Sequence, residues 1–165
     1  MVRRIALFIF GLSAMLALTA CQKAPETRSA ANVPTAKVID DRQQDFGDYR
    51  VLYNALTTDQ LTADAARNYG ITRSKSQILL NVVLKKKSGD SGYMPISGKV
   101  SAKANNLTGQ LKNISMREIT DGEAVYFIGQ SSVTDGEYLT FSIEALPTGA
   151  TKPMAVTFKQ QFYTK

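Results

Sequence analysis

The sequence predicts an all-β domain, an immunoglobulin-like antiparallel β-sandwich of about seven strands with one short helix. Three observations favour this fold class. Apolar and polar residues alternate with period two over much of the chain after position 45. Asp-Gly turn signals separate strand-like segments, and the one helical pattern is short. A small β-barrel is the alternative, because strand number alone does not decide whether a sheet closes.

Strand-like segments account for most of this region. Four alternate between an apolar and a polar face: 48–55, 96–104, 138–145 and 154–163. Two are apolar on both faces, which is typical of central strands: 77–85 and 124–131. The segment 109–119 alternates less regularly and is also expected to be a strand. In 138–145 the pattern places Leu139 and Phe141 on the apolar face and Tyr138 on the polar face.

Two Asp-Gly turns, 120–123 and 134–137, stand between strand candidates. Asp-Gly tolerates the positive φ angles of a two-residue hairpin loop, so three antiparallel strands are expected between about 110 and 145. Each turn carries a carboxylate pair, Asp121 with Glu123 in one and Asp135 with Glu137 in the other. At solvated hairpin tips these carboxylates would serve turn formation rather than acid catalysis or calcium binding.

The helix is expected over 63–69. Thr62 is a good N-cap for it, and Gly70 supplies the residue that ends it. Most aromatic side chains fall at core-facing positions of the strands, and we expect them to pack in the core: Tyr49, Tyr53, Tyr126, Phe127, Phe141, Phe158, Phe162 and Tyr163. Tyrosines left together on an outer face would instead form a binding patch.

The first 21 residues resemble a bacterial lipoprotein signal. Arg3 and Arg4 precede an uncharged segment, 5–18, whose helical length of about 21 Å falls short of the roughly 30 Å hydrocarbon core. This is typical of a secretory signal peptide rather than a membrane-spanning helix. The sequence Leu-Thr-Ala-Cys at 18–21 resembles the lipobox, in which the peptide is cut before the Cys and the Cys receives the lipid. We therefore predict a signal peptide over 1–20 and a lipid attached to Cys21.

The segment 21–44 has the composition of a flexible tether, with Pro25, Pro34 and few large apolar residues. A tether of this length would hold the domain, expected over 45–165, roughly 25–30 Å from the bilayer. Gln22 after the lipidated Cys resembles the class sorted to the outer membrane. The expected location is thus the inner leaflet of the outer membrane, with the domain facing the periplasm.

The composition excludes several kinds of chemistry. The chain has no His and a single Cys, so it contains no Ser-His-Asp triad, no His-bearing metal site and no intrachain disulfide. The sequence Gly-Asp-Ser-Gly at 89–92 copies the surroundings of a protease nucleophile, yet no base is present to activate Ser91, and we expect a flexible hairpin loop there. We assign no catalytic, metal or cofactor residues.

The chain is basic, with a net charge of +6 and a run of lysines at 85–87. Such a run can attract anionic lipid headgroups, or it can keep a strand edge solvated. Nucleic acid is not expected as a partner, because the compartment is wrong and few aromatic residues lie among the charges. Partners from the envelope, either a protein or an anionic lipid, fit better, although the sequence assigns no partner-binding residue.

Several strings together resemble an exported proteobacterial family, domain of unknown function 4426. They are FGDYRVLYNAL (46–56), YGITRSK (69–75), LLNVVL (79–84), NLTGQL (106–111), REITDGEAVYFIG (117–129) and QQFYTK (160–165). The resemblance spans the domain and leaves out the signal and the tether. It implies an exported β-sandwich and transfers no functional residue.

These observations favour a non-enzymatic binding or interaction module of the cell envelope, attached to the membrane through Cys21 and needing no cofactor. The rival is an envelope enzyme or small-ligand carrier whose site uses neither His nor Cys. A deep pocket that holds a carboxylate or lysine of strongly shifted pKa would favour the rival. A filled core would favour the module.

Overall fold

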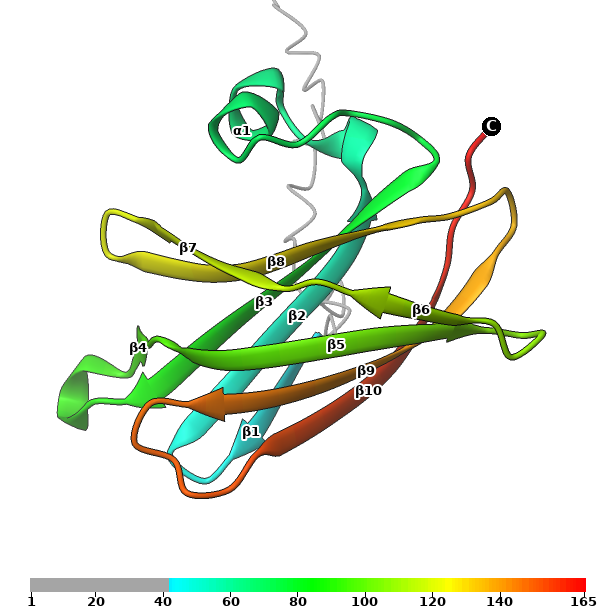
Figure 1. Cartoon of the computed structure of the whole chain (residues 1–165). Helices are drawn as coiled ribbons and strands as arrows, with labels where there is room; N and C mark the ends of the chain where they lie inside the picture. The colour runs from blue at the N-terminus through cyan, green and yellow to red at the C-terminus, as the bar shows by residue number, and fades with distance from the viewer. Residues whose placement is uncertain (1–41) are drawn as a thin grey trace, which may run out of the picture. The chain divides into compact units, whose positions relative to one another are not determined.

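The computed structural model describes residues 42–165, which form two antiparallel β-sheets packed face to face (Figure 1). The signal peptide, Cys21 and most of the expected tether lie outside the described residues. The described fold begins with a strand at Gln43, so its first residues fall inside the segment that the composition assigned to the tether.

The first sheet contains the central strand β3. Its strands are, in spatial order, β1 (Gln43–Phe46), β2 (Tyr49–Thr57), β3 (Gln77–Lys87), β8 (Ala124–Ser132) and β7 (Arg117–Asp121), with β4 (Tyr93–Pro95) paired to the end of β3. The second sheet consists of β10 (Met154–Gln161), β9 (Tyr138–Pro147), β5 (Gly98–Asn106) and β6 (Leu111–Ile114). The predicted all-β sandwich is confirmed. The barrel alternative is wrong, because the described strands form two separate sheets.

The main core lies between the sheets and follows the predicted alternation. In β3 Ile78, Leu80, Val82 and Leu84 are fully buried against the second sheet. From that sheet β9 contributes Leu139, Phe141, Ile143 and Ala145. In β9 the alternate residues Tyr138, Thr140, Ser142 and Glu144 face outward, as period-two alternation requires.

A smaller apolar cluster covers the outer face of the first sheet. Leu79 of β3 and Ile128 of β8 point outward there and are buried by Ile71. Ile71 belongs to the excursion 58–76, which carries the 3₁₀ turn η1 (Thr58–Gln60) and the helix α1 (Ala63–Asn68). The segments that form β3 and β8 were expected to be apolar on both faces. They are, because the second sheet covers one face and the excursion 58–76 covers the other.

The predicted helix is confirmed, together with both of its ends. The Thr62 hydroxyl accepts a hydrogen bond from the backbone N–H of Ala65 at 3.2 Å. Gly70 follows the helix with φ = +63°, a conformation that costs glycine little. The expected hairpin at 87–93 also forms, with the 3₁₀ turn η2 (Gly89–Ser91) between β3 and β4.

The expectation of one strand over 109–119 is wrong, because the chain changes sheets in the middle of it. β6 pairs with β5 in the second sheet, whereas β7 pairs with β8 in the first. The crossing passes close over Gly129 of β8: a Cβ there would lie 2.5 Å from Cγ2 of Ile114 and 2.7 Å from Sδ of Met116. The missing side chain at Gly129 makes room for the crossing, and the irregular alternation of 109–119 reflects it.

Only one of the two Asp-Gly hairpins forms. β7 and β8 pair through the first turn, with Gly122 and Glu123 as its two loop residues. At 134–137, however, the chain passes from β8 in the first sheet to β9 in the second, so these strands do not pair. Gly136 has the positive φ that the motif indicates. An Asp-Gly turn can therefore connect two paired strands of one sheet or two strands of different sheets. The turn residues alone do not decide which strands pair.

Candidate binding surface

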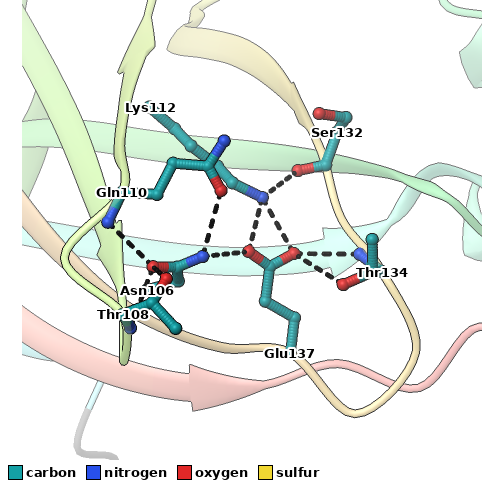
Figure 2. A network of polar contacts seen from close by, with 7 residues as sticks. All are labelled: Asn106, Thr108, Gln110, Lys112, Ser132, Thr134 and Glu137. Carbon is teal, nitrogen blue, oxygen red and sulfur yellow. Dashed lines mark hydrogen bonds and ion pairs between the residues drawn. The ribbon is translucent and has the colours of Figure 1, made fainter.

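A buried ion pair lies at one end of the sandwich (Figure 2). Lys112 Nζ of β6 lies 2.7 Å from Oε1 of Glu137, the residue that precedes β9. The two side chains are only 11% and 8% exposed. Lys112 also donates a hydrogen bond to the backbone oxygen of Ser132 at the end of β8, at 2.9 Å. One ammonium group therefore connects β6 and the start of β9 with the first sheet.

Asn106 extends this arrangement into the turn between β5 and β6. Its Nδ2 donates to Oε1 of Glu137 at 3.2 Å, and its Oδ1 accepts from the backbone N–H groups of Thr108 and Gln110. The Oγ1 of Thr108 donates to the same Oδ1 at 2.7 Å. Together with Lys112, Ser132 and Thr134 these residues make up the Glu137 network. The network fixes the β5–β6 turn and the 134–137 connection to each other (Figure 2).

The pKa of Glu137 lies below its ordinary value. Burial alone would raise this pKa, because burial disfavours a charged carboxylate. The hydrogen bonds from Lys112, from the backbone N–H of Thr134 and from Asn106, together with the charge of Lys112, outweigh burial. The expectation that Glu137 stands at a solvated hairpin tip is wrong: its carboxylate is enclosed and paired.

We expect the stability of the fold to decrease in acid, in part through Glu137. A carboxyl group whose pKa is lowered by folding stabilises the fold above its unfolded pKa, near 4.5, and loses that contribution as the pH falls through the folded pKa. Glu137→Gln removes this titration. The midpoint of urea unfolding, measured between about pH 7 and 3, should therefore change less in the variant than in the wild type. Equal changes would contradict the assignment.

Exposed apolar side chains gather at the end of the sandwich that the Glu137 network supports. Leu107 in the β5–β6 turn is 82% exposed, Leu111 at the start of β6 is 53%, Tyr138 at the start of β9 is 37% and Tyr163 after β10 is 67%. We call these four residues the apolar end.

The strand register brings the four residues together. Asn106 pairs with Leu139, so Leu107 and Tyr138 are the next residues beyond this pair. Leu111 stands opposite Asn105, on the other side of β5. Tyr138 pairs with Gln161, whose Oε1 accepts a hydrogen bond from the Tyr163 hydroxyl at 2.8 Å. Figure 1 shows the β5–β6 turn, the start of β9 and the end of β10 at the same side of the molecule.

The aromatic predictions were mostly right. Tyr53, Phe127, Phe141 and Phe162 are buried, and Tyr49, Tyr126 and Phe158 pack against the two clusters. Tyr163 was wrongly expected in the core. β10 ends at Gln161, and beyond it the chain follows the 134–137 connection, with the Thr164 N–H bonded to Oδ1 of Asp135 at 2.9 Å. Tyr138 is exposed, as the alternation predicted.

The lysines are distributed unevenly. Lys103 of β5 and Lys159 of β10 are exposed on the outer face of the second sheet and form no ion pair within residues 42–165. The lysine run at the end of β3 lies at the opposite end, near the start of β5, where Lys86 Nζ stands 5.5 Å from the Tyr49 ring centre. The apolar end thus has its own, separate basic neighbours.

The remaining sequence features show no assembled chemistry. Ser91 lies exposed in η2, and Asp121 and Glu123 are exposed at the β7–β8 turn, as expected. Within the described part of the chain, no group of three or more His, Cys, Asp or Glu residues could hold a metal ion. An open hollow of about 250 Å³ on the outer face of the second sheet contains Lys103 and Glu144.

The Glu137 network was missed by sequence reasoning. One signal was present: Lys112 lies two residues before the apolar Ile114, in the segment whose alternation fails, so the two residues share one face. In a strand with alternating faces this places the lysine on the inward side. An inward lysine requires a buried partner, but the sequence does not say which of its carboxylates is near.

The fold and this end of the molecule define a class: a two-sheet antiparallel β-sandwich with an exposed apolar end braced by a buried ion pair. The model of the family described as "Domain of unknown function (DUF4426)" matches residues 43–165. The chain belongs to this family, which confirms the resemblance seen in the sequence.

Solved structures similar to this chain share its fold. A DUF4426 family protein from Pseudomonas aeruginosa PAO1 is 28% identical, with 74% of this chain and 94% of that chain covered and a TM-score of 0.64. A copper-bound variant of FetP from uropathogenic Escherichia coli is 11% identical, with 74% and 95% covered and a TM-score of 0.53. FetP expressed in the periplasm is 10% identical, with 73% and 92% covered and a TM-score of 0.51.

At such identities the likeness to FetP shows the fold alone. The comparison with curated proteins finds no match. Within residues 42–165 no helix has the length and apolar character needed to cross a bilayer.

Proposed function

We propose that the protein is a lipid-anchored, non-enzymatic binding module of the bacterial cell envelope. In this proposal Cys21 carries the lipid, the anchor lies in the inner leaflet of the outer membrane, and the domain faces the periplasm. The support for the location is the signal peptide and lipobox in the first 21 residues, with Gln22 after the Cys.

The observation that carries the binding function is the apolar end. Leu107 and Leu111 expose most of their side chains to water, although the three leucines of β3 and Leu139 of β9 are buried. The Glu137 network holds the backbone beneath them, so their exposure does not come from a loose terminus. Several large apolar side chains exposed together on a fixed support are a mark of a site that binds a partner.

The rival function, an enzyme or a small-ligand carrier, has less support. The hollow beside Lys103 and Glu144 is open on a sheet face, and both charged residues are exposed. Acid–base catalysts need burial or close charges to shift their pKa values. The copper in the FetP structure gives no reason to expect copper here, because an identity of 11% shows only a shared fold.

Cys21→Ala is expected to abolish labelling of the protein by radioactive fatty acid and to release the domain from membranes. The reason is that the acyl chains hold the protein at the membrane, contributing about 0.8 kcal/mol per buried CH₂. Fractionation of cells and acyl labelling measure both effects. Gln22→Asp is the matched control: it should keep the label and move the protein toward the inner membrane. Membrane retention of unlabelled Cys21→Ala protein would contradict the anchor.

Photo-crosslinking in living cells tests the binding function. Photo-reactive residues placed one at a time at Leu107, Tyr138 and, as a distant control, Met94 should give envelope adducts only at the first two positions. Met94 is a suitable control because it is 44% exposed and lies in β4, near the start of β5 rather than its end. Equal adducts at all positions, or none, would contradict a binding role for the apolar end.

A further inference from the structure

We propose that the apolar end contacts the lipid bilayer itself, with Leu107 entering the boundary between headgroups and acyl chains. The inference rests on the proposed function and names the partner of the same surface. It assigns the contact to an anionic phospholipid leaflet rather than to a protein.

The shape and composition of the apolar end fit a bilayer surface. Leu107 is the most exposed large apolar residue among those described, and it lies in a turn that projects beyond the ladder of β5 and β9. Tyr138 follows next along the β5–β9 ladder, and Tyr163 lies just beyond the end of β10, which pairs with Tyr138; both have apolar rings and polar hydroxyl groups. A membrane interface changes from polar headgroups to apolar acyl chains. A projecting leucine can enter the acyl region while nearby tyrosines keep their hydroxyl groups among the headgroups.

The charges around the apolar end are complementary to an anionic leaflet. Lys103 and Lys159 point from the outer face of the second sheet without an ion-pair partner within 42–165. The acidic residues of this end are already neutralised, since Glu137 pairs with Lys112 and Asp135 with Lys165. The exposed Glu144 shares the hollow with Lys103, so this face carries two lysines against one carboxylate near the apolar end. Each lysine near an anionic surface strengthens membrane binding severalfold.

The start of the described chain lies on the same part of the sandwich. The Arg42 guanidinium donates to Oε1 of Gln160 at 3.3 Å, and the next residue, Gln161, pairs with Tyr138. A chain of 20 residues between Cys21 and Arg42 would span only roughly 25 Å on average if it is flexible. A lipid on Cys21 would thus leave the apolar end within reach of the bilayer.

The contact is expected to be weak for a free domain and substantial for an anchored one. Two leucines and two tyrosines are a small apolar surface. Tethering converts the contact into an intramolecular one, with an effective concentration on the order of millimolar for a short flexible linker. The apolar end would then orient the domain on the membrane without providing the anchor.

Tryptophan fluorescence tests the proposal directly, because the chain contains no Trp. The lipidated full-length protein carrying Leu107→Trp is reconstituted into vesicles of phosphatidylethanolamine and phosphatidylglycerol, with and without brominated acyl chains. The expected result is blue-shifted emission that brominated lipid quenches. Met94→Trp, at the other end of the sandwich, should remain red-shifted and unquenched. Red-shifted, unquenched emission from both variants would overturn the proposal. The proposed lipid anchor on Cys21 would not be affected by that result as long as the protein is acylated.

A second measurement avoids the added indole ring. Unlipidated protein that begins at position 21 and carries Cys21→Ala is floated with the same vesicles, and Leu107→Asp on this background should lower partitioning by about tenfold. Lys103→Glu with Lys159→Glu should lower partitioning further, and only with anionic vesicles. Equal partitioning of all variants would overturn the proposal. A blue shift of Leu107→Trp that occurs in native envelopes but not in protein-free vesicles would also overturn it, since a protein would then occupy the surface.

Discussion

Glu137→Ala is expected to lower the free energy of unfolding by about 3–5 kcal/mol. The substitution leaves the Lys112 ammonium, only 11% exposed, without its carboxylate and with one remaining hydrogen bond, to the Ser132 carbonyl. It also removes the acceptor for Thr134 N–H and Asn106 Nδ2. An unpaired charge that stays buried is among the largest single destabilising changes.

The double variant Lys112→Met with Glu137→Leu shows whether the loss comes from one unpaired buried charge or from the absence of the ion pair itself. Both charges are then absent, and apolar side chains of similar length occupy the space. We expect the double variant to lose much less stability than Glu137→Ala, because well-packed apolar residues often replace a buried ion pair at little cost. Urea unfolding followed by circular dichroism measures each variant. A loss of stability equal to the sum of the losses from Lys112→Met alone and Glu137→Leu alone would show that the two residues act independently.

The exposed pair of α1 is the matched control. Asp64 and Arg67 form an ion pair with side chains 82% and 71% exposed. Asp64→Ala is expected to change stability by less than about 1 kcal/mol, since water and salt already screen such a pair. If both pairs gave similar losses, burial would not be the reason for the importance of Glu137.

Period-two alternation predicted most strands, because it depends only on which face each residue presents. The buried residues Leu139 and Phe141, the exposed Tyr138 and the doubly apolar β3 all follow from it. The helix followed from the Thr62 cap and Gly70. These features are local, and the residues that decide them are neighbours in the sequence.

Features that depend on distant parts of the chain were not predicted. The change of sheet after β6 requires space over Gly129, a residue of a later strand. The 134–137 turn connects two sheets because β3 and β5 already flank β8 and β9 respectively. The candidate site has the same property, because Asn106, Lys112 and Glu137 meet only in the folded molecule.

Phe141→Ala is expected to cost about 3–5 kcal/mol, a large part of the 5–15 kcal/mol that typically stabilises a domain. Phe141 is fully buried, stacked on Phe158 at 4.6 Å between ring centres, with Phe162 edge-on at 6.2 Å. Phe158 in turn contacts Tyr53 of the first sheet at 4.9 Å. The stack therefore joins the two sheets, and removing its central ring leaves a cavity that the flanking strands cannot close.

Two further variants show whether the cavity is the cause. Phe141→Leu keeps most of the volume and should lose clearly less than Phe141→Ala, because the cost of a core truncation rises with the cavity left behind. Tyr138→Ala, in the same strand but on the outer face, should lose less than about 1 kcal/mol. Urea unfolding of the three variants measures how much stability each one loses. A loss from Tyr138→Ala as large as that from Phe141→Ala would mean that the outer face of β9 packs against something that stabilises the fold, and the apolar end would then not be a free surface.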